Sequence, residues 1–333
     1  MKISACFEPL EFDEFLSSAT AAEKCGYHRI YVTDASLIWR DVYVYMTRAL
    51  AATERCDVAS FVTNPVTRHW TTTASAHATL AQMHPGRVIL GIGRGESSVR
   101  TLGLQPMKSA EYAALVPRIA ALMAGESVGD DDRELRITWA NTRVPLMLGA
   151  TGPKNLKLAG ALADIVMLQV GGLPVAARWA IDWVRKGAEE AGRNPHDLQI
   201  VATCDLCVSE DEEEIRETGA VTAVVAGNHL RRVIRMSPEH GMPDELIEAA
   251  EGTKAAYDYF QHCVPGADQY AKVTGEMIRH FSIVGTDGEC LAHLRALGEA
   301  GVDEIAVFPM NGRLEQMEIV RDRILPALEP VTS

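Results

Sequence analysis

Small and polar residues follow many of the short apolar runs in this sequence, and their types suit a flat ligand that carries charge. These segments are residues 7–8, 34, 63–64, 93–96, 149–152 and 169–172. Glycines let backbone amides approach a ring or a phosphate closely, while amide, hydroxyl and carboxylate groups can match the edge of a heterocycle. The pattern predicts one binding site assembled from several strand ends.

The glycine run at residues 91–96 resembles a dinucleotide-binding fingerprint but does not match it. Glu96 stands where G-x-G-x-x-G requires its third glycine, and the run follows the fourth strand instead of opening a βαβ unit. A P-loop is excluded because no glycine is followed by Lys-Ser or Lys-Thr in the required frame. These departures argue against a Rossmann or P-loop site.

Residues 149–154 pass from a strand into the first turn of a helix. Unpaired amides at a helix N-terminus form an anion site, and Lys154 adds positive charge there. A cofactor phosphate is one interpretation of this segment. The alternative is a tight turn in which Pro153 is the first helical residue.

Eight short apolar strands alternate with helical stretches and would hold these segments together. The predicted strands are residues 2–7, 29–33, 57–63, 87–92, 145–148, 164–169, 199–208 and 303–308. Such strands joined by helices indicate a buried parallel sheet, and eight units favour a closed (β/α)8, or TIM, barrel over an open sheet. We therefore predict one α/β barrel domain over residues 1–333, with function at the carboxyl ends of its strands.

Two stretches depart from this repeat. Residues 134–139 alternate as a short exposed strand would, and about ninety residues separate the seventh strand from the eighth. The acidic run 211–214 is typical of a first helical turn, and residues 262–266 break the helical pattern. We predict a helical insertion over residues 209–280 that covers a ligand or makes a dimer contact.

Composition excludes several classes of protein. Apolar residues make up 47% and charged residues 23% of the chain, and the net charge of −13 opposes binding to nucleic acid or anionic lipid. The N-terminus lacks the features of a signal peptide, and no apolar run approaches the roughly 18 residues that span a bilayer. We expect a cytoplasmic protein with no membrane or nucleic-acid partner.

Cysteines and other potential metal ligands lack the spacing of a disulfide framework or a metal site. The seven cysteines are scattered, and Cys204 and Cys207 fall in the predicted strand 199–208, where an offset of three points to opposite faces. We expect these two thiols to pack in the core. The sequence predicts no metal, and the lack of a G-x-S-x-G motif weighs against a serine hydrolase.

Two motifs carry a family resemblance. Residues 62–69 (VTNPVTRH) and 85–96 (PGRVILGIGRGE) resemble the bacterial-luciferase-like superfamily, and residues 149–154 and 285–309 fit the same family. Within it the chain most resembles the branch of methylenetetrahydromethanopterin reductase and related enzymes that use coenzyme F-420 (F420). Trp70 stands where relatives commonly have proline, and Ala35 where some related dehydrogenases have histidine.

The resemblance implies a barrel, usually dimeric, that holds FMN or F420 across its strand ends, with a non-proline cis peptide at Ser60–Phe61. By the same mapping Asp34, Thr63, Asn64, Gly95 and Glu96 line the ring edge. The full set of expected cofactor contacts is Ser60, Phe61, Thr63, Asn64, Gly95, Gly149, Ala150, Thr151, Gly152, Lys154, Val170, Gly171 and Gly172.

Three polar residues have a second interpretation beside the functional one. Asn64 matches the donors and acceptors of the ring edge, or serves as a turn residue before Pro65. Asp34 orients substrate or takes a proton, or caps the loop before Trp39. Glu96 is an acid or a ring contact, or pairs with Arg68 or Arg94.

These features predict an oxidoreductase that transfers hydride between F420 and a small organic substrate. The alternative is a luciferase-like monooxygenase that uses reduced FMN and oxygen, with a flavin reductase as a further partner. A barrel that has lost catalysis and only binds a partner is a third hypothesis, which the intact polar strand ends disfavour. A homodimer or higher homo-oligomer is expected in each case.

Overall fold

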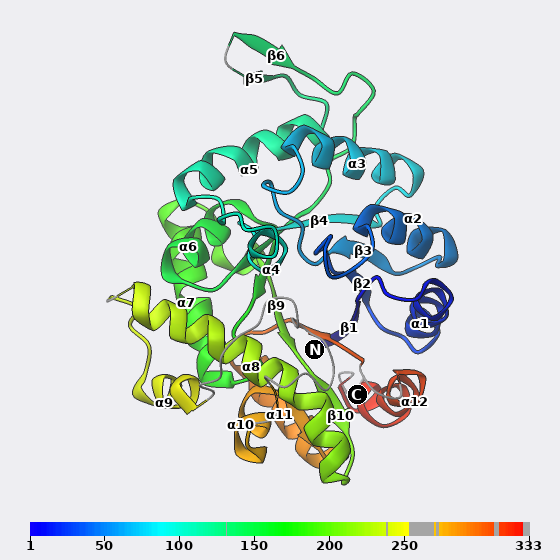
Figure 1. Ribbon diagram of the computed structural model, residues 1–333, viewed down its shortest axis with the longest axis vertical. Helices are drawn as coiled ribbons and strands as arrows, with labels where there is room; N and C mark the ends of the chain where they lie inside the picture. Colours follow the sequence, from blue (N-terminus) through cyan, green and yellow to red (C-terminus); the bar gives the residue numbers. More distant parts are fainter. Residues whose placement is uncertain (131, 238, 253–269, 271–272, 310–312, 329–333) are drawn as a thin grey trace.

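The computed structural model describes residues 1–130, 132–237, 239–252, 270, 273–309 and 313–328, and its centre is a closed barrel of eight parallel strands (Figure 1). In order around the barrel these are β1 (Lys2–Phe7), β12 (Glu304–Val307), β9 (Gln199–Cys204), β8 (Ile165–Leu168), β7 (Leu146–Ala150), β4 (Val88–Ile92), β3 (Asp57–Ser60) and β2 (Arg29–Val32). Pairing of β1 with both β2 and β12 closes the cylinder. The predicted (β/α)8 barrel is confirmed.

Helices surround the barrel and follow its strands. They are α1 (Phe12–Lys24), α2 (Val42–Ala52), α3 (Trp70–Met83), α5 (Ser109–Met123), α6 (Pro153–Leu162), α7 (Pro174–Glu190), α11 (Asp287–Glu299), α12 (Arg313–Ile319) and α13 (Leu325–Leu328). The Asp41 carboxylate accepts hydrogen bonds from the amides of Tyr43 and Val44 and so caps α2. Pro153 occupies the first turn of α6, as expected.

Side chains inside the barrel fill its lower and middle layers. Ten buried residues form this inner cluster: Cys6, Tyr31, Ala59, Phe61, Ile89, Met147, Ile165, Met167, Val201 and Ala306. A larger cluster packs between the outside of the strands and the helices. The larger of the two cavities described among the placed residues therefore lies above these layers, at the carboxyl ends of the strands.

The predicted strand 199–208 is wrong as a single element. It breaks at the fully buried Asp205, so β9 stays in the barrel, while β10 (Leu206–Val208) leaves it and pairs with β11 (Ile283–Gly285). Cys204 and Cys207 consequently lie in different sheets. Both thiols are free and buried, and burial raises the pKa of each.

Helices occupy the insertion between β9 and β12. They are α8 (Glu212–Met236), α9 (Asp244–Gly252) and α10 (Gly275–Phe281), and the Asp211 side chain caps α8. In Figure 1, α8 lies across the α7 side of the barrel opening. The expected break at residues 262–266 lies outside the described residues.

Two smaller expectations are also corrected. The added ribbon is an antiparallel hairpin of β5 (Val128–Asp130) and β6 (Arg133–Leu135), earlier than the predicted strand 134–139 because the chain already reverses between these two strands. Arg87 begins the predicted strand 87–92 at the amino end of the barrel, a position that predicts a structural salt bridge, but it instead donates to the carbonyls of Leu50, Thr53 and Cys56. The carbonyls at the end of α2 need donors, and this guanidinium supplies them. None of the helices in the described ranges has the length and apolarity to cross a membrane.

Candidate active site

A cavity of about 950 Å³ opens at the carboxyl ends of the strands. Its walls come from the loops after the strands, from the short helix α4 (Ser97–Arg100) and from one face of α8. The volume is in the range of sites that enclose a small molecule or cofactor. Function at this end of the barrel is the usual arrangement for the fold.

The cavity floor is apolar. Phe61, Val62, Met167 and Phe308 line it, and the Phe61 ring packs against both Tyr31 below and Phe308 beside it. These side chains continue the inner core of the barrel upward. A flat aromatic ring can rest on such a floor with its polar edges directed toward the walls.

A non-proline cis peptide shapes this floor, one residue beyond the predicted position. The cis bond joins Phe61 to Val62, whereas the sequence predicted it at Ser60–Phe61. The shift arises because Ser60 is still the last residue of β3 and is held against β4 by hydrogen bonds to Gly91. The chain bulges after it and returns to β4 at Thr63, whose amide donates to the Gly91 carbonyl.

Glycine opens the wall above β4. Gly95 has φ of +90°, and a Cβ there would lie 2.3 Å from a methyl carbon of Val99. Both the backbone conformation and the space therefore require glycine at this position. The bare backbone at Gly95 can approach a ligand closely.

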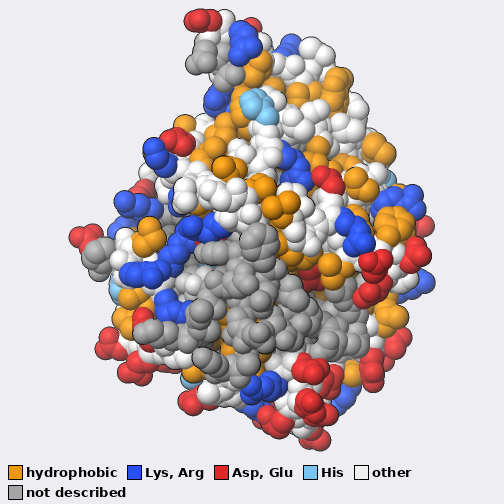
Figure 2. Space-filling model, in the orientation of Figure 1, with side chains coloured by type: hydrophobic (Ala, Val, Ile, Leu, Met, Phe, Trp, Pro, Cys, Tyr) orange, Lys and Arg blue, Asp and Glu red, His pale blue; other side chains and the backbone are white. Residues whose placement is uncertain are grey.

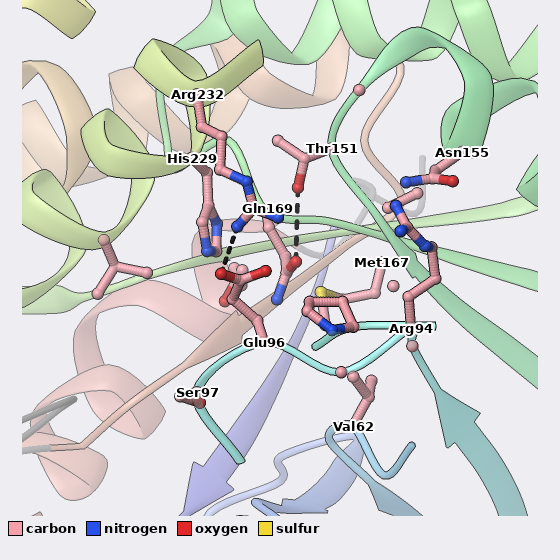
Figure 3. A pocket seen from close by; sticks show the side chains of 18 of the residues that line it. Val62, Arg94, Glu96, Ser97, Thr151, Asn155, Met167, Gln169, His229 and Arg232 are labelled. Carbon is pink, nitrogen blue, oxygen red and sulfur yellow. Dashed lines mark hydrogen bonds and ion pairs between the residues drawn. The ribbon is translucent and has the colours of Figure 1, made fainter. Parts of the chain in front are cut away.

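The first turn of α6 forms a cationic end of the cavity. Gly149, Ala150, Thr151, Gly152 and Lys154 all line it, and the amides of this turn are directed toward the helix N-terminus. The side-chain Oδ1 of Asn155 accepts a hydrogen bond from the hydroxyl of Ser109. Figure 3 shows Arg94 and Asn155 together on one side of the cavity.

No ion pair within the described residues joins Arg94 or Lys154 to a carboxylate, although the charge of Glu96 favours the charged form of Arg94. Arg94 donates through Nε to the Met107 carbonyl at 2.5 Å, and burial together with the nearby charge of Arg232 lowers the pKa of its guanidinium. Lys154 is exposed beside it at the rim. Figure 2 shows Lys and Arg side chains gathered over the region of α6 and the C-terminal end of α8, although the chain as a whole is acidic.

Asp34 lies in the wall after β2, held by an ion pair. Its Oδ2 accepts from the Thr63 hydroxyl at 2.7 Å and from Arg68 at 2.6 Å, and Arg68 also contacts Asp41. The carboxylate is 6% exposed. It can fix the Thr63 hydroxyl in place, but its charge is already compensated.

Glu96 lies between two arginines. Its Oε1 accepts from Arg100 Nε at 2.5 Å and from Arg232 Nη1 on α8. Burial raises the pKa of Glu96, but the hydrogen bonds and charges of Arg232 and Arg100 outweigh it and hold the pKa below its ordinary value. Glu96 does not pair with Arg68, which is engaged by Asp34, because α8 brings Arg232 over the loop, but the charge of Glu96 does favour the charged form of Arg94.

His229 lines the same side of the cavity, one turn before Arg232 on α8. Figure 3 shows both side chains directed from α8 toward Glu96. Its Nδ1 is buried without a hydrogen-bond partner. Burial and Arg232 lower the pKa of the imidazole, against the opposing effects of Glu96 and the Gln169 backbone.

Four of the expected cofactor contacts lie behind the cavity wall. The Ser60 hydroxyl donates a hydrogen bond to the Gly91 carbonyl, and the Val170 side chain is fully buried. Gly172 donates to the Phe281 carbonyl and accepts from His293. Asn64 has the contacts of a turn residue: its Oδ1 accepts from the amides of residues 66 and 67, and its amide donates to Ser98.

The remaining expected residues meet at the cavity, together with others that sequence reasoning missed. Asp34, Phe61, Thr63, Gly95, Glu96 and Gly171 line it along with the α6 turn. The missed residues are His229 and Arg232, since no local pattern places the middle of a long helix over the barrel mouth. In the described ranges no group of three or more His, Cys, Asp or Glu side chains could hold a metal ion.

The fold and cavity define a ligand-binding barrel, and comparison places it in a family. A profile of the luciferase-like monooxygenase family matches residues 6–304. Because the match spans most of the 333 residues, the chain belongs to the luciferase-like monooxygenase family.

Particular relatives include both deazaflavin and flavin proteins. The chain is 31% identical over 301 residues to the 5,10-methylenetetrahydromethanopterin reductase of Methanolobus tindarius, covering 86% of this chain and 87% of that protein. The structure of the coenzyme F420-dependent tetrahydromethanopterin reductase from Methanopyrus kandleri has a TM-score of 0.79 at 22% identity and covers 98% and 99% of the two chains. The oxygenating constituent of 3,6-diketocamphane monooxygenase from Pseudomonas putida, solved with FMN, has a TM-score of 0.68 at 16% identity and covers 99% of each chain.

Proposed function

We propose that this protein is an oxidoreductase that transfers hydride between F420 and a small organic substrate. The observation that carries the proposal is the cavity itself, with an apolar floor, a glycine-rich wall and a cationic end at α6. The resemblance to the F420-dependent glucose-6-phosphate dehydrogenase of Nakamurella multipartita, 30% identical over 233 residues, supports F420 as the cofactor.

The residues present fit such a cofactor. Phe61, Val62 and Phe308 would support the ring, and the bare backbone at Gly95 would lie near its edge. Residues 149–152, with Lys154 and Arg94, would hold the phosphate, because amides at a helix N-terminus and cations favour an anion. When bound, F420 supplies a ring carbon that accepts or gives a hydride.

Asp34 and Glu96 have positioning roles in this proposal. Asp34 fixes the Thr63 hydroxyl against the cavity, and Glu96 holds Arg232 over it. Since two arginines keep the pKa of Glu96 low, its carboxylate stays ionised at neutral pH and cannot donate a proton there. Exclusion of water by α8 would complete the site.

A monooxygenase that uses reduced FMN is the second candidate. The TM-score of 0.68 to the FMN-bound monooxygenase from Pseudomonas putida favours it, and the same α6 turn would hold the FMN phosphate. A flavin reductase would then be required as a partner. Side-by-side fluorescence titration with F420 and FMN distinguishes the two, since the true cofactor should bind stoichiometrically.

Arg94→Ala tests the proposed phosphate position. Loss of a charge-assisted hydrogen bond should weaken binding of F420 and FMN by about 10-fold or more, a cost of about 1.5–3 kcal/mol. Riboflavin, which lacks the phosphate, should bind wild type and variant equally. Arg133→Ala on the β5–β6 hairpin is the matched control and should change neither affinity; an equal loss for riboflavin would contradict the phosphate assignment.

The cytoplasmic location and the homodimer expected from the sequence also belong to this proposal. Six buried free thiols are suited to a reducing compartment, and relatives in the resembling family are usually dimeric. Light scattering during gel filtration measures the molar mass in solution. A mass equal to that of one chain would contradict the proposed homodimer.

A further inference from the structure

The two acids expected to transfer a proton are both neutralised by arginine. Oδ2 of Asp34 receives two hydrogen bonds, one of them from Arg68, and Oε1 of Glu96 contacts Arg100 and Arg232. Position 35, where some related dehydrogenases have histidine, is alanine. Where the substrate is an alcohol or a carbonyl compound, the proton that accompanies the hydride therefore needs another group.

His229 differs from an ordinary structural histidine in how its ring is bonded. His77 is fully buried and has both nitrogens engaged, Nδ1 with the Thr73 carbonyl and Nε2 with the Ser60 hydroxyl. His229 lines the cavity, is only partly buried as a residue, and leaves its Nδ1 without a partner. A buried polar atom without a partner is costly, so its retention at a cavity wall points to a ligand.

The charges that face His229 come from the loop after β4 and from its own helix. Glu96 favours the protonated imidazole, whereas Arg232, which is bonded to Glu96, favours the neutral form. The Gln169 backbone after β8 also favours protonation, and burial opposes it. The result is an imidazole that is neutral at pH 7 beside a carboxylate able to stabilise its cation.

We propose that His229 is the proton-exchanging group of this cavity, an inference that rests on the proposed hydride-transfer function. When a substrate hydroxyl is oxidised, its carbon gives up a hydride with the C–H electron pair to the oxidised deazaflavin, and C–O becomes C=O. The O–H proton passes to the neutral imidazole, which becomes imidazolium next to Glu96. Reduction of a carbonyl runs the same exchange backward, so charge and protons balance in both directions.

The test follows the imidazole by NMR in protein labelled with 15N-histidine. The His229 signal, assigned by its loss in His229→Gln, should titrate in the free wild-type protein with a pKa below that of an ordinary histidine. Reduced F420 or reduced FMN, whose rings carry negative charge, should raise its pKa by about half a unit or more. The His77 signal is the internal control and should not respond.

The same coupling should appear in cofactor affinity. If bound cofactor favours the imidazolium, wild-type affinity for the reduced cofactor should fall about threefold or more as pH rises through the His229 titration. His229→Gln should remove this pH dependence, whereas Asn228→Ala, a neighbour on α8 outside the cavity, should keep it.

Each outcome decides the matter. A His229 signal that does not titrate, or that ignores bound cofactor, overturns the role of His229 and leaves the proposed function intact. A pH dependence of cofactor affinity that persists in His229→Gln also overturns the role of His229 and leaves the proposed function intact. Failure of the wild type to bind either cofactor overturns the proposed function, and this inference with it.

Discussion

The two ends of the barrel both bury polar side chains, but only one end satisfies them internally. At the amino ends of the strands, Arg29, Glu304 and their neighbours form a closed network of hydrogen bonds. At the carboxyl ends, Thr33 Oγ1 and His229 Nδ1 line the cavity and are buried without partners. The contrast separates polar groups that stabilise the fold from polar groups retained for a ligand.

The lower network centres on the fully buried carboxylate of Glu304. It accepts from Arg29 at 2.5 Å, from Ser4 at 2.6 Å, from Tyr31 at 2.7 Å and from Gln199 at 2.9 Å. Arg29 in turn reaches Asp57 and Gln199. These bonds close the bottom of the barrel and connect five of its strands, β1, β2, β3, β9 and β12, so the polar groups here are satisfied within the protein.

Removal of Glu304 should produce the largest loss of stability. Glu304→Ala leaves the buried Arg29 guanidinium with the Gln199 amide and the longer ion pair to Asp57, and breaking a buried ion pair costs about 3–5 kcal/mol. Urea unfolding measures the loss. Glu299→Ala, an exposed residue on α11, should change stability by less than about 0.5 kcal/mol. Similar free energies of unfolding for the two variants would contradict a stabilising role of the hydrogen-bond network around Glu304.

Asp205 at the upper end should make stability depend on pH. Burial, with a smaller effect of Glu8, raises its pKa to about 7, although hydrogen bonds from Thr222 oppose the shift. The folded protein holds a proton that the unfolded chain releases, so this contribution is complete below about pH 4 and is lost as pH rises through 7. The loss is on the order of 4 kcal/mol, since one pKa unit corresponds to about 1.4 kcal/mol.

Urea unfolding of Asp205→Asn at pH 5, 6, 7 and 8 measures this dependence. The asparagine cannot ionise, so the variant should lose less stability than wild type over that interval. Asp211→Asn, at the exposed cap of α8, should follow the wild-type curve. If the Asp205→Asn and wild-type curves run parallel, Asp205 does not titrate in this range.

Local patterns in the sequence were sufficient for the barrel. The first strand was predicted at 2–7 and lies there, and most other strand ends were placed within two residues because buried parallel strands are continuous apolar runs. The exception is 199–208, which reads as one apolar run although Asp205 breaks it. The hydrogen bond from the Thr222 amide, which anchors Asp205 beneath α8, depends on a helix that follows later in the chain.

The site could be predicted only where its residues follow strands. Position relative to a strand end placed Asp34, Thr63, Gly95 and Glu96 at the cavity. The contact between Glu96 and Arg232 depends on where α8 crosses the mouth, which no local periodicity encodes. Asn64 shows that position after a strand is not sufficient to predict a ligand contact. Its residue type suits both a ring contact and a turn, and its observed hydrogen bonds are those of the turn.

Two buried hydroxyl groups, one at each end of the barrel, test the difference between the two ends most directly, although the expected changes in stability are the smallest. Ser4 Oγ donates to Glu304 and accepts from the Arg29 amide, so Ser4→Ala should cost about 1–2 kcal/mol in urea unfolding. Thr33 Oγ1 has no partner and lines the cavity, so Thr33→Val should leave stability unchanged or raise it by up to about 1 kcal/mol. Cofactor titration should show the reverse order, with binding weakened a few-fold by Thr33→Val and unaffected by Ser4→Ala. Equal destabilisation by both changes would mean that buried polar groups at the carboxyl ends are hydrogen-bonded within the protein as fully as those at the amino ends. The proposed difference between the two ends of the barrel would then be wrong.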